Sequence, residues 1–189
     1  MIIGIDEVGR GCWAGPLVAA AVGLDEDHRI SGLNDSKKLS VKKRLQLASE
    51  IKKETDQIGI GWVWPREINK LGLTKSVQLA MQRAVDEVTL SNHQIIIDGH
   101  INYLTHLPNT TPIIKADGTV PAVSAASIIA KVARDLYMQE IATKYHQYGF
   151  EKHVGYGTKL HIDALSQYGV TPIHRINYKP VKKWLVNTT

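Results

Sequence analysis

The stretch GIDEVGRG, residues 4–11, joins an apolar strand opening to two adjacent carboxylates and then to an arginine framed by glycines. Successive side chains of a regular strand point to opposite faces, so Asp6 and Glu7 can serve one site only if the strand ends or twists at Glu7. Gly9 and Gly11 supply that irregularity, because glycine adopts backbone angles that other residues avoid. They also let the backbone approach a ligand closely.

Apolar runs and helical stripes alternate along the rest of the chain, which predicts a mixed α/β sheet flanked by helices. The expected strands cover residues 2–7, 17–23, 58–64, 93–99 and 111–118. The expected helices cover about 41–55, 123–146, 160–168 and 179–186, with another that begins at Thr74. The stripes expected to face the core are Val41, Leu45, Ala48 and Ile51 in the first helix, Val77, Ala80, Met81, Ala84, Val85 and Val88 in the second, and Ile129, Val132, Ala133, Leu136, Tyr137 and Ile141 in the longest.

Three acids, Asp6, Asp98 and Asp117, each fall at the C-terminal end of a predicted strand. Ligands of α/β sheets bind in the crevice outside those ends, so acids far apart in sequence can converge there. Converging carboxylates repel one another unless a cation lies among them. None of these positions is His or Cys, and hard divalent ions prefer oxygen ligands, so the pattern indicates Mg²⁺ or Mn²⁺. Two such ions about 3.5–4 Å apart can hold an attacking water and a leaving oxygen across a phosphodiester.

Longer motifs along the chain carry a resemblance to a known family. The motifs are GIDEVGRG, AGPLVAAAV, DSKKLS, IIIDG, KADG, SAASIIAKVARD, YGFEKHVGYGTKLH and PIHRINYKPV. In this order, from residue 2 to about residue 182, they resemble bacterial ribonuclease HII, in the type 2 ribonuclease H family. The resemblance implies a ribonuclease H-like mixed sheet flanked by helices, with a small C-terminal helical segment. Residues 1–150 would form the catalytic core, and residues 151–189 a substrate-contacting loop and C-terminal helical extension of the same domain.

The resemblance also implies an activity. Members are metal-dependent endonucleases that cleave the RNA strand of RNA–DNA hybrids and nick at ribonucleotides embedded in duplex DNA, leaving 5′-phosphate and 3′-hydroxyl ends. Hybrid and ribonucleotide-containing duplex DNA are therefore the expected partners, and two Mg²⁺ or Mn²⁺ ions the expected cofactors. Carried over by motif, the family's catalytic and metal-binding acids fall on Asp6, Glu7, Asp98 and Asp117.

Substrate contacts follow from the same motifs. The family's sugar-reading residues fall on Gly9, Arg10 and Gly11. They are expected to contact the 2′-hydroxyl, the group by which a protein tells RNA from DNA. Tyr156 matches the family's junction tyrosine, whose ring packs on the sugar of the following deoxynucleotide. Lys37 of DSKK and Lys115 of KADG match basic positions expected to hold phosphates.

Composition places the chain among globular proteins, since its 189 residues are 43% hydrophobic and 22% charged. The net charge is +5, and residues 151–189 hold six Lys/Arg against two Asp/Glu. That basic tail suits a phosphate backbone, although a solvated helical tail has the same composition. The lone Cys12 excludes a disulfide within the chain and favours a reducing compartment. With no signal-peptide pattern and no apolar run of membrane-spanning length, we expect a cytoplasmic monomer without a membrane partner.

Three other functions fit parts of the pattern. The sister ribonuclease HIII typically has an extra N-terminal domain and a lysine between the glycines, whereas residue 10 here is Arg and the first acid is residue 6. A non-catalytic hybrid-binding module would not need all four acids. A DNA-only nuclease of the same fold, such as a junction resolvase, would cut all-DNA substrates.

Other polar residues have ordinary structural interpretations. Asp135 competes for the role of fourth acid, but it lies four residues after Lys131, so an ion pair along a helix, or support of the site, is the preferred interpretation. His153, His161 and His174 show no paired metal-ligand spacing and are interpreted as surface residues near the basic tail.

Overall fold

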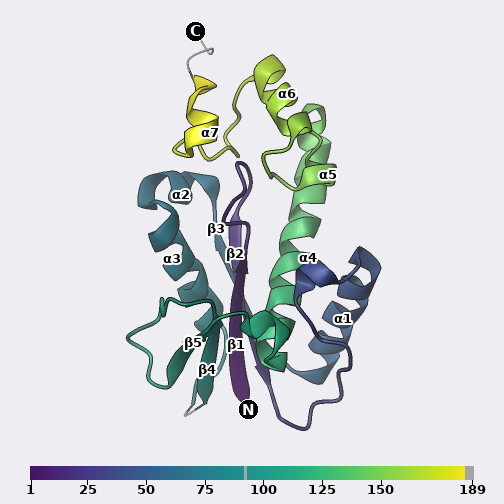
Figure 1. Ribbon diagram of the computed structural model, residues 1–189, viewed down its shortest axis with the longest axis vertical. Helices are drawn as coiled ribbons and strands as arrows, with labels where there is room; N and C mark the ends of the chain where they lie inside the picture. The colour runs from purple at the N-terminus through teal and green to yellow at the C-terminus, as the bar shows by residue number, and fades with distance from the viewer. Residues whose placement is uncertain (92, 186–189) are drawn as a thin grey trace.

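The computed structural model describes residues 1–91 and 93–185 and contains one five-stranded sheet with the order β3-β2-β1-β4-β5 (Figure 1). The strands are β1 (Ile2–Val8), β2 (Leu17–Leu24), β3 (Ile58–Val63), β4 (Gln94–Asp98) and β5 (Thr110–Ile113). β1, β2 and β3 pair antiparallel, while β4 lies parallel to both β1 and β5. The predicted mixed sheet is therefore confirmed.

Helices cover both faces of this sheet. The helices of the described residues are α1 (Val41–Glu54), α2 (Pro65–Leu71), α3 (Leu73–Val85), α4 (Pro121–Lys144), α5 (Phe150–His153), α6 (Lys159–Tyr168) and α7 (Lys179–Lys182), and α5, α6 and α7 lie beyond one end of the strands (Figure 1). Residues of β2 alternate between two hydrophobic clusters, because Ala19 and Ala21 pack in the α3 layer and Val18 and Ala20 in the layer of α1 and α4. Every residue of β2 is buried, as expected of a central strand covered on both sides. In Figure 1, α3 and α4 lie on opposite sides of the strands.

The end of β5 and the segment after β3 differ from the prediction. The strand expected over residues 111–118 ends at Ile113, because Lys115 adopts left-handed backbone angles (φ 60°) and Ala116–Gly118 forms a 3₁₀ turn. No helix was predicted between the strand 58–64 and Thr74, because a proline directly after a strand is typical of a break between elements. Pro65 instead occupies the first turn of α2, where a missing N–H costs no hydrogen bond.

Helix faces were predicted well for α3 and poorly for α1 and α4. The α3 stripe is buried from Val77 to Val85, but Val41, Leu45 and Leu136 are 57%, 45% and 50% exposed. Near its N-terminus α4 packs so closely on β1 that a Cβ on Gly4 would lie 2.2 Å from the backbone of Ala122 and Val123. In the N-terminal half of α4 nearly every side chain is buried, and most of these side chains are small. The large apolar residues on which the prediction relied therefore do not mark the inner face of this half.

The glycines of β3 make a similar close contact with α3. A Cβ on Gly61 would lie 1.9 Å from the carbonyl oxygen of Ala80, which is helix backbone and cannot swing aside. We expect Gly61→Ala to lower the free energy of unfolding by about 1–3 kcal/mol, the usual cost of overpacking. Urea denaturation measures this as a lower midpoint at unchanged slope. Gly118→Ala is the control, since the nearest atoms to its Cβ would be 4.0 Å away; equal midpoints for the two variants would contradict the prediction.

The segment after α4 forms a third hydrophobic cluster around Tyr148, Phe150 and Leu165. It is tied to the loop after β1 by an isolated bridge between Ala14 and His174. The prediction of surface histidines is wrong here. His153, His161 and His174 are only 6%, 0% and 1% exposed.

The predicted C-terminal helix 179–186 is shorter in the structure, where α7 ends at Lys182; residue 186 lies outside the described residues. Among the helices of residues 1–91 and 93–185, none combines the length and apolar character needed to cross a bilayer.

Candidate active site

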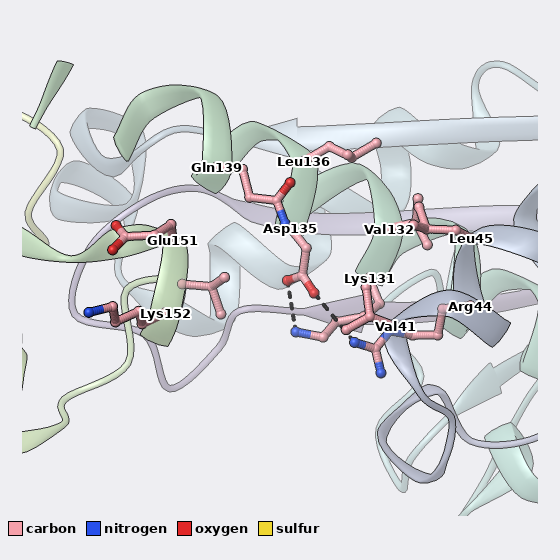
Figure 2. Close-up of a pocket in the computed structure, with 11 residues that line it drawn as sticks. Val41, Arg44, Leu45, Lys131, Val132, Asp135, Leu136, Gln139, Glu151 and Lys152 are labelled. Carbon is pink, nitrogen blue, oxygen red and sulfur yellow. Dashed lines mark hydrogen bonds and ion pairs between the residues drawn. The ribbon is translucent and has the colours of Figure 1, made fainter. Parts of the chain in front are cut away.

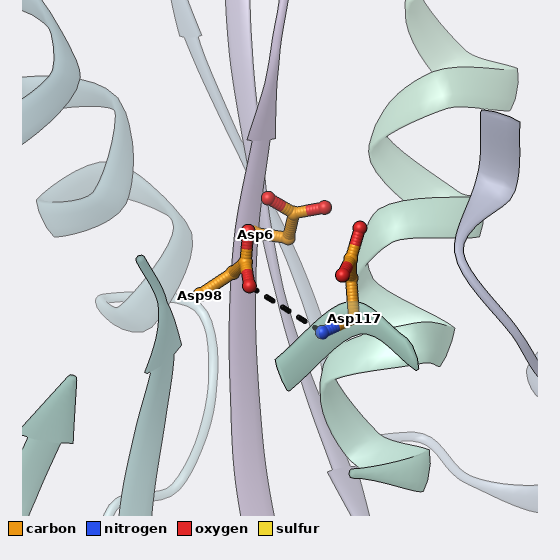
Figure 3. Close-up of side chains that lie close together, drawn as sticks. All are labelled: Asp6, Asp98 and Asp117. Carbon is orange, nitrogen blue, oxygen red and sulfur yellow. Dashed lines mark hydrogen bonds between the residues drawn. The ribbon is translucent and has the colours of Figure 1, made fainter. Parts of the chain in front are cut away.

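Three carboxylates from separate segments meet at one end of the sheet (Figure 3). Asp6 lies on β1, and Asp98 is the last residue of the parallel neighbour β4. Asp117 comes from the 3₁₀ turn after β5, where its backbone N–H donates to Asp98 Oδ1 at 3.4 Å. One carboxylate oxygen from each residue lies within 4.8 Å of those of the other two. The three predicted acids therefore converge, although Asp117 lies in a 3₁₀ turn and not at the end of a strand.

Glu7 lies beside this cluster. Strand β1 continues one residue past Glu7, to Val8, so of the two predicted alternatives, an end or a twist at Glu7, the strand does not end there, and Asp6 lies two residues before its last residue. Asp6 and Glu7 nevertheless line the same cavity of about 280 Å³. The ladder with β4 stops at the pair Ile5–Ile97, which leaves that side of β1 open beyond Ile5. Glu7 Oε1 accepts a hydrogen bond from Arg10 Nη1 at 3.1 Å.

The electrostatics of the cluster disfavour its charged state. Burial, followed by the charges of Glu7 and Asp98, raises the pKa of Asp6 well above its usual range. Burial also raises the pKa of Asp117, with the Asp98 charge adding to it and Lys37 opposing it. Lys37 Nζ lies 3.8 Å from Asp117 Oδ2, but Lys37 is exposed and screened by water, so it compensates weakly.

Glu7 shows the same trend. Its pKa is raised by burial, while the Arg10 guanidinium acts in the opposite direction. Carboxylates that are buried together and short of compensating charge need a cation. The donor atoms are all carboxylate oxygens, which fit a hard divalent ion and not a softer metal. The site therefore has the composition of a divalent-metal centre.

The loop after β1 places the predicted sugar-reading residues at the cavity's edge. Gly9 has φ +90°, and a Cβ there would lie 2.5 Å from Arg134 Nε, so only glycine fits without displacing that side chain. A Cβ on Gly11 would lie 4.0 Å from the ring of Tyr156. Tyr156 is 40% exposed and lines the same cavity as Asp6. The structure thus brings Tyr156 beside the loop between β1 and β2, residues 9–16, which we call the glycine loop.

The two predicted phosphate contacts are placed differently. Lys37 lines the cavity, with Nζ 3.7 Å from Asp35 Oδ1 in addition to its contact with Asp117. Lys115 has an exposed side chain just before the 3₁₀ turn and is not among the residues that line the cavity. Lys37 is therefore close to the acids, whereas Lys115 lies outside the set of residues that line the cavity.

Sequence reasoning missed two buried arginines under the glycine loop. Arg134 Nε donates to the carbonyl of Pro16 at 2.8 Å and its Nη2 to that of Ala14 at 3.2 Å. Arg175 Nε and Nη2 both donate to the carbonyl of Gly15 at 3.0 Å. Both side chains are fully buried, and neither has a carboxylate within 4.0 Å among the described residues. Both occur in family motifs, ARD and HRIN, but charge pattern alone gives no sign that they are buried.

Asp135 belongs to a neighbouring cavity between α1, α4 and α5 (Figure 2). Its Oδ1 accepts from Lys131 Nζ at 2.8 Å, and its Oδ2 lies 3.9 Å from Arg44 Nη2. The predicted ion pair along the helix is confirmed. Arg44 and Lys131 line both cavities, so these two cations link Asp135 to the site.

A hydroxyl pair also borders Asp6 and was not predicted. Ser127 of α4 and Ser36 of the 3₁₀ turn Ser36–Lys38 lie with their Oγ atoms 2.9 Å apart, and both are buried. A hydrogen bond from the Ser127 side chain lowers the pKa of Asp6, against the larger effect of burial. Ser127, the last residue of the SAAS sequence at 124–127, therefore stabilises the charged form of Asp6.

Comparison with known proteins agrees with this geometry. The chain matches the model of the family Ribonuclease HII over residues 3–181. It is 46% identical over 190 residues to Ribonuclease HII of Shewanella pealeana, covering 96% of this chain and 89% of that protein. It is 47% identical over 186 residues to Ribonuclease HII of Vibrio parahaemolyticus, covering 98% and 87%.

The fold agrees as well. The crystal structure of ribonuclease H2 from Pyrococcus horikoshii OT3 superposes with a TM-score of 0.82 at 28% identity, covering 96% of this chain and 95% of that one. The predicted ribonuclease H-like fold is confirmed. A family match over nearly the whole chain, together with three converging carboxylates, shows that this chain belongs to the ribonuclease HII family and is a metal-dependent endonuclease of the ribonuclease H type, in a family that nicks at ribonucleotides and leaves 5′-phosphate and 3′-hydroxyl ends.

Proposed function

We propose that the cavity at the end of β1 and β4 hydrolyses the RNA strand of RNA–DNA hybrids and nicks duplex DNA at embedded ribonucleotides. The proposal assigns the catalytic and metal-binding roles to Asp6, Glu7, Asp98 and Asp117. The observation that carries it is the carboxylate cluster, in which oxygens of Asp6, Asp98 and Asp117 lie within 4.8 Å of one another. Glu7 lines the same cavity as Asp6.

In this proposal the four acids hold two Mg²⁺ or Mn²⁺ ions. When bound, such ions supply an activated water and stabilise the 3′-oxygen as it leaves. The chain's own contribution is to fix the carboxylates before substrate arrives. Asp6 accepts from the Glu7 N–H at 2.7 Å, and Asp98 accepts from the Asp117 N–H at 3.4 Å, so the carboxylate positions are set by backbone contacts.

We assign substrate recognition to the glycine loop and the segment that packs against it. The sugar-reading residues proposed are Gly9, Arg10 and Gly11. Tyr156, whose exposed ring lies next to Gly11, is proposed to pack on the neighbouring sugar. Lys37 is assigned to a phosphate beside the acids. Lys115 is assigned to a phosphate further along the duplex, because its side chain is exposed outside the cavity.

The remaining assignments concern the chain as a whole. We propose that residues 1–150 form the catalytic core and that residues 151–189 add a substrate-contacting loop and helical extension. The bridge between Ala14 and His174 supports this, since it joins the extension to the glycine loop. A cytoplasmic monomer stays the expected state.

A cleavage assay with three labelled duplexes tests the function: a full RNA–DNA hybrid, a DNA duplex with one ribonucleotide, and an all-DNA duplex. Each is incubated with Mg²⁺, Mn²⁺ or a chelator. We expect metal-dependent cutting of the first two only. A non-catalytic hybrid-binding module would shift the duplex on a gel and leave it intact, and a DNA-only nuclease would cut the all-DNA duplex, so either result contradicts the proposal.

Arg10→Ala tests the sugar-reading loop. Arg10 is half exposed and bonded to Glu7, so its loss removes one charged hydrogen-bond donor and leaves the Asp6 cluster in place. We expect kcat/KM on the single-ribonucleotide duplex to fall about tenfold or more, the scale of a hydrogen bond to a charged group. Metal-induced thermal stabilisation should change little. Arg66→Ala, on the exposed side of α2, is the control; an unchanged rate for Arg10→Ala would remove Arg10 from recognition.

A further inference from the structure

Three buried histidines next to Tyr156 have no part in the acid cluster. His161 and His174 are 0% and 1% exposed, and their Nε2 atoms lie 3.1 Å apart. His153 stacks on His161 with ring centroids 4.7 Å apart. Burial lowers the pKa of His161 to about 4 and, with the neighbouring His161, that of His174 to about 3. Burial lowers the pKa of His153 as well. All three rings are therefore neutral at neutral pH, and each carries one N–H.

The hydrogen bonds of the two deepest rings fix which nitrogen carries that proton. The backbone N–H of Thr171 donates to His174 Nδ1 at 2.9 Å, so the His174 proton is on Nε2. His174 Nε2–H then donates to His161 Nε2, which leaves the His161 proton on Nδ1. His161 Nδ1–H donates to the carbonyl of Tyr156 at 3.0 Å. The result is a one-way chain of donors from Thr171 to the backbone of Tyr156.

The third ring holds the same backbone from the other side. His153 Nδ1 accepts from the N–H of Gly155 at 3.2 Å, and its Nε2 lies 2.8 Å from the carbonyl of Tyr148, to which it donates. The backbone here needs support, because Val154 and Gly155 have φ values of 43° and 87°, and a Cβ on Gly155 would lie 2.3 Å from the carbonyl oxygen of Ala14. The His161 ring thus holds the carbonyl of Tyr156, the His153 ring holds the N–H of Gly155 one residue earlier, and the backbone carbonyl of His153 accepts from the N–H of Tyr156 at 2.9 Å.

We propose that His174 and His161 are positioning residues that act in series, His174 orienting His161 and His161 holding the carbonyl of Tyr156, so that the tyrosine ring stays beside Gly11 at the substrate. The inference rests on the substrate contact proposed for Tyr156. Neither histidine touches the acids: both lie in the cluster around Tyr148 and Phe150, outside the cavity that Asp6 lines. Their loss should therefore affect substrate binding more than the chemical step.

Two near-isosteric replacements of His161 separate positioning from packing. The amide nitrogen of Asn occupies the place of Nδ1 and can still donate to Tyr156. The amide of Gln reaches the place of Nε2, where its oxygen can accept from His174 Nε2–H, but it leaves no donor for the Tyr156 carbonyl. We expect His161→Gln to raise KM for the single-ribonucleotide duplex about three- to tenfold, the scale of one hydrogen bond, with kcat changed less than about twofold. His161→Asn should stay within about twofold of wild type in KM. Both variants remain polar, and thermal unfolding verifies that both are folded.

A double-mutant comparison completes the test. In a Tyr156→Ala background, His161→Gln should add little to the rise in KM, because both changes remove the same contact. Equal KM values for the Asn and Gln variants, or additive effects in the double variant, would overturn the positioning role. Tyr156→Ala with wild-type KM would remove the proposed contact of Tyr156 and this inference with it, while an inactive wild-type protein would contradict the proposed function itself.

Discussion

Asp6→Asn is expected to reduce cleavage at least about 10³-fold, the upper range for losing a single preorganised electrostatic contact, and to make the metal-free protein more stable. Both effects follow from the position of Asp6, which shares the acid cluster with Asp98 and Asp117. Asparagine keeps the oxygen that accepts from the Glu7 N–H, so the backbone contact survives. What is lost is one negative charge, which repels its neighbours without metal and attracts a cation when one binds.

The pH dependence of stability shows why Asp6→Asn should make the metal-free protein more stable and not less stable. The pKa of Asp6 in the folded protein is raised above its unfolded value by burial and by the charges of Glu7 and Asp98. A group with a raised folded pKa contributes stability below its unfolded pKa, near 4, and that contribution is lost as pH rises through the folded pKa. Metal-free wild-type protein should therefore lose stability as pH rises from about 4 towards neutrality. Asp6→Asn should show a flatter curve.

Thermal unfolding between pH 4 and 8, with a chelator or with Mn²⁺, measures both effects. Wild type should gain stability from Mn²⁺ at pH 7, and Asp6→Asn should gain much less. The matched control is Asp163→Asn, which removes a carboxylate from an exposed ion pair with Lys159 on α6. It should behave as wild type within about 0.5 kcal/mol. An Asp6→Asn protein with wild-type turnover, or one less stable than wild type at pH 7 without metal, would contradict the assignment.

The acids were predictable because each follows or sits in an apolar run whose hydrophobic period is visible in sequence. Asp98 after three isoleucines is the clearest case, since an acid at the end of a buried strand needs a compensating partner. The turn that carries Asp117 was not predictable from the hydrophobic pattern. The chain leaves the strand conformation at Lys115, which has left-handed backbone angles, and not at a glycine or proline that would mark a turn in the sequence. The convergence itself depends on parallel pairing of β1 with β4, which only the folded chain shows.

The sequence prediction missed polar residues that are buried although their residue types are usually exposed. Histidine and arginine are ordinarily exposed or half exposed, so sequence reasoning assigned His161 to the surface and no role to Arg175. Both are buried because backbone groups satisfy their nitrogens: the carbonyl of Tyr156, five residues earlier, for His161, and the distant carbonyls of Gly15 and Arg10 for Arg175. Such partners carry no side-chain signature. A single sequence therefore located the acids but not the supports of the substrate loop.

Arg175→Met is expected to lower the free energy of unfolding by about 2–4 kcal/mol and to reduce cleavage with it. Two effects oppose one another. Removing an unpaired buried guanidinium relieves a desolvation cost, and burial already lowers the pKa of Arg175. However, the carbonyl of Gly15 loses both bonds from this side chain, and an unsatisfied buried group costs about 1–3 kcal/mol. The Arg10 carbonyl keeps its bond from the Tyr178 hydroxyl at 2.8 Å, so its loss is smaller.

The loss outweighs the relief because methionine leaves the buried carbonyl of Gly15 without a side-chain donor. The guanidinium's own cost was already offset by its three partners, the carbonyls of Gly15 and Arg10 and the hydroxyl of Tyr178. Arg175→Lys decides between charge and geometry. A lysine keeps the positive charge but lacks the planar fork that reaches the Gly15 and Arg10 carbonyls together. If geometry matters, Lys should lose most of the activity that Met loses, measured as kcat/KM on the single-ribonucleotide duplex at a temperature where both variants are folded. If Lys restores wild-type cleavage, the charge beneath the loop is what the substrate's phosphates require, and the hydrogen bonds to Gly15 and Arg10 are secondary.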